Sequence, residues 1–164
     1  MSVPKLLPLK QWRCDSCGEL IEKPQDGYVE WRDRKNSAGL YMNYGFRIVH
    51  HAPHSPRAAK GGNCYYSNEE RGGDLDLEAF LGYGGLIHMT SFIDAGKEFD
   101  RAYTGPSIDD LRNWTETLRR LQIPYYEEAR GYFAEARRGN WDDANEVYFY
   151  VPETLKKIIV EYGS

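Results

Sequence analysis

The chain has 164 residues, of which 41% are hydrophobic and 28% charged, with a formal net charge of -4 and a mean hydropathy of -0.70. Aromatic residues make up 14% of it, which excludes intrinsic disorder over most of the length, because disordered chains are poor in these bulky groups. No apolar run approaches the roughly 20 residues that cross a bilayer, and Leu6-Leu7-Pro8-Leu9 is too short for a signal-peptide core. We therefore expect a cytoplasmic protein with reduced thiols that does not enter membranes.

The two halves of the sequence differ in charge. Residues 1–71 contain 11 Lys/Arg and 8 Asp/Glu, a net charge of +3, whereas residues 72–164 contain 10 and 17, a net charge of -7. Six cations with a single acidic residue among them make the stretch 32–60 the most basic segment: Arg32, Arg34, Lys35, Arg47, Arg57 and Lys60. A polyanion, if one binds, is expected to bind there.

Short β-type runs and turn residues dominate the first half. Residues 27–31 alternate as a strand, and a loop is expected over 33–39. Residues 45–51 form the clearest strand, which places Phe46, Ile48 and His50 on one face. These patterns predict a β-rich first lobe.

Helical spacing dominates the second half. Short helices are expected over 75–81 and 86–95, with an interruption at Gly82, Gly84 and Gly85 between them. Ser107 followed by Asp110 predicts the start of an amphipathic helix, and Pro124 predicts its end and the start of the next. The aromatic and β-branched residues 146–151 are interpreted as a strand, followed by a final helix from Pro152.

These elements predict an α+β fold. An N-terminal zinc-binding, β-rich lobe over residues 1–71 packs on a mainly helical C-terminal lobe, residues 72–164, which contains one strand.

The segment Cys14-Asp-Ser-Cys17-Gly18 carries the most specific chemical signal. Two thiolates separated by two residues can point into one tetrahedral metal site, and glycine after the second cysteine relieves the tight backbone. A redox dithiol would instead favour the start of a helix in a thioredoxin-like βαβ unit, whereas these flanks are strand-like. The segment therefore predicts a zinc knuckle.

One thiol and a histidine cluster downstream complete the predicted site. Cys64 is the third cysteine, and His50, His51 and His54 lie between it and the knuckle. His50 is the preferred fourth ligand because it shares a strand face with apolar residues, while His51 and His54 remain alternatives. The predicted ligand set is Cys14, Cys17, His50 and Cys64 around Zn²⁺, a closed structural site that can supply on the order of 10 kcal/mol to the folding of a small lobe.

The knuckle Cys14-Asp-Ser-Cys17-Gly18 resembles those of zinc ribbons and treble-clef fingers. The resemblance covers these five residues, and the family implies a small β-rich module that binds nucleic acid or partner proteins. The downstream pair differs from the family pattern of a second close pair, since His50 and Cys64 are fourteen residues apart.

From these features we expect a zinc-stabilised, non-enzymatic binding or adaptor protein with a protein partner. A first alternative is a nucleic-acid-binding regulator that uses the basic segment 32–60, with weak and salt-sensitive binding. A second alternative is a small hydrolase built around His88 with Ser91 or Asp94. No motif of a metalloprotease or a nucleobase deaminase is found in the sequence.

Overall fold

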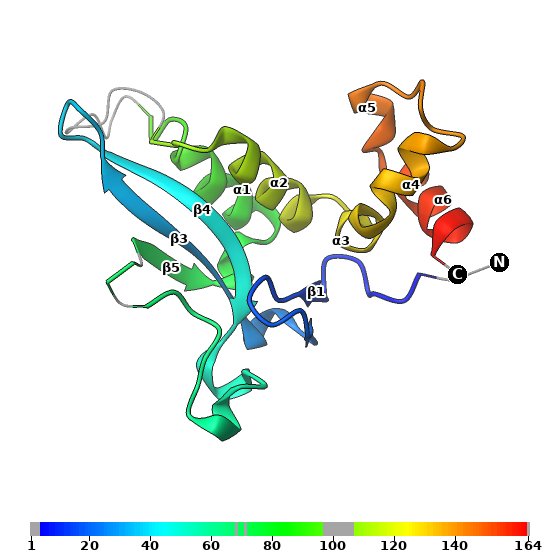
Figure 1. Cartoon of the computed structure of the whole chain (residues 1–164). Coiled ribbons are helices and arrows are strands. Elements are labelled where there is room, and N and C mark those ends of the chain that lie inside the picture. Colours follow the sequence, from blue (N-terminus) through cyan, green and yellow to red (C-terminus); the bar gives the residue numbers. More distant parts are fainter. Residues whose placement is uncertain (1–3, 68, 71, 97–106, 164) are drawn as a thin grey trace.

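A computed structural model describes residues 4–67, 69–70, 72–96 and 107–163. Its strands are β1 (Trp12–Arg13), β2 (Leu20–Ile21), β3 (Gly27–Lys35), β4 (Tyr41–His50) and β5 (Gly73–Asp76). Its α-helices are α1 (Gly82–Ser91), α2 (Leu111–Gln122), α3 (Tyr126–Ala129), α4 (Phe133–Arg138), α5 (Glu146–Phe149) and α6 (Pro152–Tyr162). The α+β class is confirmed, and these strands all precede these helices (Figure 1).

A three-stranded antiparallel sheet with the order β4-β3-β5 is the centre of the first lobe. The strands β3 and β4 form a long hairpin in which Gly27 pairs with His50 and Lys35 with Tyr41. The loop expected over 33–39 starts later in the structure, because β3 continues to Lys35. The reversal follows at Asn36, whose side-chain oxygen accepts hydrogen bonds from the N–H groups of Ala38 and Leu40 at 2.9 and 3.0 Å.

The outer edge of β4 is covered by polar groups from other elements. Asn43 donates its N–H to the carbonyl oxygen of Ser107, and its own carbonyl accepts from Asp109. Further along, the Asn113 amide binds both backbone groups of Phe46, accepting at 2.6 Å and donating at 2.9 Å. An exposed strand edge is a template for unwanted pairing, so these contacts both fix α2 beside the sheet and block this edge.

One face of the sheet carries the main apolar core. Trp31 and Phe46 stack with ring centroids 6.0 Å apart, and Phe92, which follows α1, packs edge-on against both at 5.0 Å. Helices α1 and α2 lie against this region (Figure 1). The buried members of this core are Trp12, Cys14, Ile21, Val29, Phe46, Ile48, Val49, Cys64, Leu77, Phe80, Met89, Trp114 and Leu121.

The glycines at 82, 84 and 85 do not interrupt a helix, contrary to the expectation from the sequence. Helix α1 runs through them from Gly82 to Ser91, and the expected helix over 75–81 is instead β5 followed by a 3-10 turn, Leu77–Phe80. A Cβ at position 85 would lie 1.7 Å from the carbonyl oxygen of Phe80. Gly85 therefore serves close packing of α1 on this turn.

The last part of the chain forms a separate helical cluster. Helices α3 to α6 share two small cores, one around Tyr126 and Leu155 and one around Phe149 and Ile158. The expected strand over 146–151 is wrong: the Asn145 side chain caps helix α5 by accepting from the N–H of Tyr148 at 2.9 Å. Phe149 and Tyr150 pack against residues of α4 and α6, so tertiary packing overrides the β propensity of this segment.

The expected boundary after residue 71 stays a prediction. Strands β3 and β4 precede this boundary, whereas the third strand of the same sheet, β5, follows it. Residues of α1 and α2 also belong to the core of the first lobe. Among the described residues, no helix has the length and apolar character needed to span a membrane.

Candidate metal centre

The first two candidate ligands lie in the tight turn between β1 and β2. These strands pair with Trp12 opposite Ile21 and Arg13 opposite Leu20, as the strand-like flanks predict. The N–H of Cys14 donates to the carbonyl oxygen of Glu19 at 2.9 Å, and the N–H of Gly18 donates to that of Cys14 at 2.8 Å. Gly18 has a φ of 79°, a left-handed conformation that glycine adopts without strain. The turn thereby orients both thiols toward the same side.

The other two candidate ligands arrive from the end of β4 and from the loop after it. The sulfur atoms of Cys14, Cys17 and Cys64 and a ring nitrogen of His50 all lie within 4.8 Å of one another. His50 Nδ1 is 3.4 Å from Cys17 Sγ and 3.9 Å from Cys64 Sγ. Cys14, His50 and Cys64 are buried, at 2%, 3% and 0% exposure, and Cys17 is partly buried. The four predicted residues therefore form one compact, largely buried cluster.

The orientation of the His50 ring is fixed from its far side. Its Nε2 lies 3.0 Å from the carbonyl oxygen of Leu20, which can only accept a hydrogen bond, so Nε2 carries the proton. In this tautomer Nδ1 presents its lone pair to the three sulfur atoms. A carbonyl partner of this kind is the usual outer support of a metal-binding histidine.

Further contacts hold the segments that carry the sulfur atoms. Ser55 Oγ lies 3.2 Å from Cys64 Sγ. The guanidinium group of Arg57 donates to the carbonyl and hydroxyl oxygens of Ser16 at 2.8 and 3.0 Å. Because Ser16 lies within the knuckle, these bonds fasten the loop that carries Cys64 to the turn that carries Cys14 and Cys17.

The cluster places the Cys17 thiol where negative charge is costly. Desolvation raises the pKa of Cys17 to about 12, and the neighbouring thiols of Cys14 and Cys64 contribute in the same direction. A divalent cation reverses this balance, because a thiol that coordinates the metal does so as the thiolate and releases its proton to solvent. The site is therefore chemically suited to a thiolate-binding cation.

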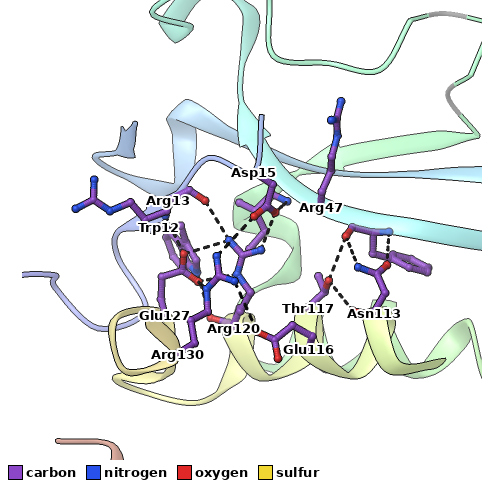
Figure 2. A network of polar contacts seen from close by, with 12 residues as sticks. Trp12, Arg13, Asp15, Arg47, Asn113, Glu116, Thr117, Arg120, Glu127 and Arg130 are labelled. Carbon is purple, nitrogen blue, oxygen red and sulfur yellow. Dashed lines mark hydrogen bonds and ion pairs between the residues drawn. The ribbon is translucent and has the colours of Figure 1, made fainter. Parts of the chain in front are cut away.

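The knuckle is also anchored to the helices by a buried ion-pair network (Figure 2). Asp15 Oδ2 accepts from Arg120 Nη1 at 2.6 Å and from the N–H of Ile48 at 2.7 Å. The same guanidinium group donates to the carbonyl oxygen of Arg13 at 3.0 Å and to both carboxylate oxygens of Glu127 at 2.6 and 3.1 Å. Arg120 is 3% exposed. Burial by itself lowers the pKa of this guanidinium group, but the carboxylates of Glu127 and Asp15 outweigh that effect and raise the pKa above its usual value.

This network was missed from the sequence, although a signal for it exists. Arg120 lies three residues after Thr117 and six after Trp114, on the buried face of α2. An arginine on the apolar face of a helix requires an acidic partner. The buried Glu127 supplies one, and Asp15 of the knuckle, which is more exposed, supplies the other.

The two alternative histidines lie outside the cluster of four. The ring of His51 packs edge-on against Tyr28, with centroids 4.6 Å apart. His54 Nδ1 lies 3.4 Å from Asp26 Oδ1. Of the three histidines that the sequence offered, the structure thus brings His50 to the cysteines.

Most cations of the basic segment have partners within the chain. Arg32 pairs with Glu70, Arg34 with Asp109 and Arg47 with Glu30, and Arg57 binds Ser16 as described. Lys35 lies 5.1 Å from the centroid of the Tyr41 ring, and Lys60 is exposed in the loop after β4. Binding of nucleic acid by this segment stays a prediction.

The residues considered for a hydrolase have local contacts. The His88 ring packs against Phe80, with centroids 5.4 Å apart. The Ser91 hydroxyl donates to the backbone carbonyl oxygen of His88 at 2.7 Å, and the Asp94 carboxylate accepts from the N–H of Gly96 at 2.7 Å. These contacts are typical of helix ends and turns.

Comparison with known proteins gives no relative: the chain matches no protein-family model, no curated protein and no solved structure.

Proposed function

We propose that this chain is a zinc-stabilised, non-enzymatic binding protein in which Cys14, Cys17, His50 and Cys64 hold one structural Zn²⁺ and the folded surface contacts a protein partner. The observation that carries the proposal is the convergence of three sulfur atoms and one imidazole nitrogen within 4.8 Å. Three thiolates and one histidine are a ligand set typical of structural zinc, whereas catalytic zinc commonly has three protein ligands and a water.

The position of the cluster supports a structural role for the metal. It joins the turn between β1 and β2, the end of β4 and the loop that contains Cys64. Apart from β4, these segments contain little regular secondary structure. A metal that crosslinks such segments replaces apolar burial as the source of stability, and its binding free energy becomes folding free energy.

The experiment is elemental analysis of the purified chain and of two neighbouring histidine variants. Wild-type protein is expected to contain about one zinc per chain. His50→Asn is expected to lose the metal, whereas the matched control His51→Asn retains it, because His51 packs against Tyr28 instead. Substitution with Co²⁺ should give the visible absorption of a tetrahedral thiolate site. A fully folded wild-type protein without bound metal would refute the proposal.

A further inference from the structure

A cleft of about 400 Å³ lies between the N-terminal segment and the start of the helical cluster, and none of the four candidate metal ligands lines it. Two consecutive carboxylates of α3 hold the segment in place. Glu128 accepts from the N–H groups of Lys5 and Leu6 at 2.9 and 2.8 Å. Glu127 accepts from the N–H of Arg13 at 2.9 Å. Both ends of the segment are therefore tied to α3, past which it runs toward β1 (Figure 1).

Three cationic side chains line this cleft: those of Lys5, Arg13 and Arg130. Lys5 and Arg13 are exposed, and within the described part of the chain neither side chain forms an ion pair. Figure 2 shows the guanidinium group of Arg13 pointing away from the Arg120 network. Both positive charges are therefore available to a ligand.

Arg130 is held only loosely by its own ion pairs. Its nitrogen atoms lie 3.3, 3.6 and 3.7 Å from oxygen atoms of Glu127, Asp15 and Glu116. A charge-assisted hydrogen bond of this kind is typically about 2.7–2.9 Å long, and the side chain is 30% exposed. A ligand in the cleft can therefore receive its N–H donors without displacing a short hydrogen bond.

The two carboxylates that line the cleft are already engaged. Glu127 accepts from two nitrogen atoms of Arg120 at 2.6 and 3.1 Å, and Glu128 accepts from two backbone N–H groups as described. A cationic ligand would compete with these bonds, whereas an anionic ligand meets donors that have no comparable partner. The lining thus favours an anion.

Phosphate is the anion that fits this lining best. The planar fork of an arginine matches phosphate and carboxylate oxygens, but a phosphate monoester carries a charge of about -1.5 to -2 at pH 7, and three cations attract it more strongly than a carboxylate. The volume of the cleft lies within the range of about 300–1,000 Å³ that is usual for small-molecule sites. Leu6 and Tyr132 add apolar lining, which suits a small organic group on the phosphate.

We propose that this cleft binds a small phosphate monoester, with Lys5, Arg13 and Arg130 around the phosphate group and Leu6 and Tyr132 beside the apolar group. The site goes beyond the proposed function, because it contains none of the metal ligands and requires no protein partner.

The test is an NMR titration of the zinc-loaded full chain with phenyl phosphate. Saturable shifts are expected for the amide signals of residues 5–13 and 127–132, with a dissociation constant of about 1 mM. Inorganic phosphate should bind more weakly, because it lacks the apolar group. Benzoate, which carries a single charge, should bind at least about threefold more weakly than phenyl phosphate.

Two double variants with the same change in net charge separate a specific site from general attraction of anions. Lys5→Gln, Arg13→Gln should weaken the binding of phenyl phosphate by about tenfold. The matched control is Lys10→Gln, Arg112→Gln, because both residues are exposed and neither lines the cleft. It should change the affinity by less than about twofold.

Three outcomes overturn the proposal. These are equal effects of the two double variants, binding of inorganic phosphate or benzoate as tight as that of phenyl phosphate, and no saturation up to about 10 mM phenyl phosphate. Zinc is measured in every sample, so that loss of metal at Cys14, which follows Arg13 in the chain, is distinguished from loss of the phosphate site.

Discussion

The carboxylate of Asp15 and the guanidinium group of Arg120 meet at 2.6 Å, and this contact joins the knuckle to helix α2 across 105 positions of sequence. Asp15 also binds both backbone groups of Ile48, through its own N–H and through its side chain. One residue of the knuckle thus connects the candidate metal centre, the edge of β4 and the helices.

Loss of Arg120 should strongly destabilise the fold. In Arg120→Met the carboxylates of Asp15 and Glu127 lose their buried partner and keep only the longer ion pairs to Arg130, at 3.6 and 3.3 Å. We expect a decrease of about 2–5 kcal/mol in the free energy of unfolding. Arg112→Met is the matched control, because Arg112 is exposed on the same helix, and should change it by less than about 0.5 kcal/mol. Urea unfolding measures both variants, and equal effects would contradict the structural role of the network.

Removal of the metal should loosen specific segments rather than the whole chain. The hydrogen bonds of β1, β2 and the end of β4 surround the candidate centre, whereas α6 packs in a separate helical core. Chelation, or the variant Cys14→Ser, is therefore expected to accelerate amide exchange over residues 12–21 and 46–50 more than in α6. Uniform acceleration along the chain would contradict this division.

Gly85 should be irreplaceable, whereas another helical glycine should not. In Gly85→Ala the new Cβ would lie 1.7 Å from the Phe80 carbonyl oxygen and 2.6 Å from Gln122 Nε2, so α1 must move away from its core. We expect a loss of at least about 1–3 kcal/mol. In Gly131→Ala the Cβ meets nothing within 4 Å, and a gain of about 0.4–1 kcal/mol is expected. Thermal melting of the two variants checks both signs.

The sequence was most informative where the chemistry depends on residue type and short spacing. The turn at the knuckle could be predicted because the motif Cys-x-x-Cys followed by glycine determines the local backbone without contacts to distant residues. The preference for His50 followed from its place on the apolar face of the strand, and His50 is 3% exposed.

Features set by distant contacts were beyond sequence reasoning. Residues 146–149 are helical because Asn145 caps them and Phe149 packs on α4 and α6. A scale of intrinsic propensities for single residues includes neither contact. Likewise, the sequence marks Asn113 only as a polar residue of α2, whereas in the structure its side-chain amide forms two hydrogen bonds with the backbone of Phe46. The glycines of α1 are typical of a break in a helix, and only the close approach of Gly85 to the Phe80 carbonyl shows why glycine is placed at that position.

Two tyrosines, the partly buried Tyr65 and the buried Tyr126, should make the fold sensitive to alkali. Burial raises the pKa of Tyr65 to about 12. Burial, and then the hydrogen bond from its hydroxyl to Glu116 Oε2 at 2.5 Å, also raises the pKa of Tyr126 above its usual value. In the unfolded chain both phenols titrate near pH 10. Above that pH the unfolded state therefore binds fewer protons than the folded state.

The free energy of unfolding should consequently fall as the pH rises from about 10 to about 12, and it should not depend on these groups below that window. Tyr126→Phe is expected to lose the stabilising hydrogen bond to Glu116 at neutral pH but to show a shallower decline in alkali, because one of the two phenols is gone. Tyr83→Phe is the matched control, since Tyr83 is 91% exposed and its substitution should leave the slope unchanged. Urea unfolding midpoints measured over this pH range compare the three proteins. A slope for Tyr126→Phe equal to that of wild type would show that the Tyr126 phenol does not retain its proton in the folded state.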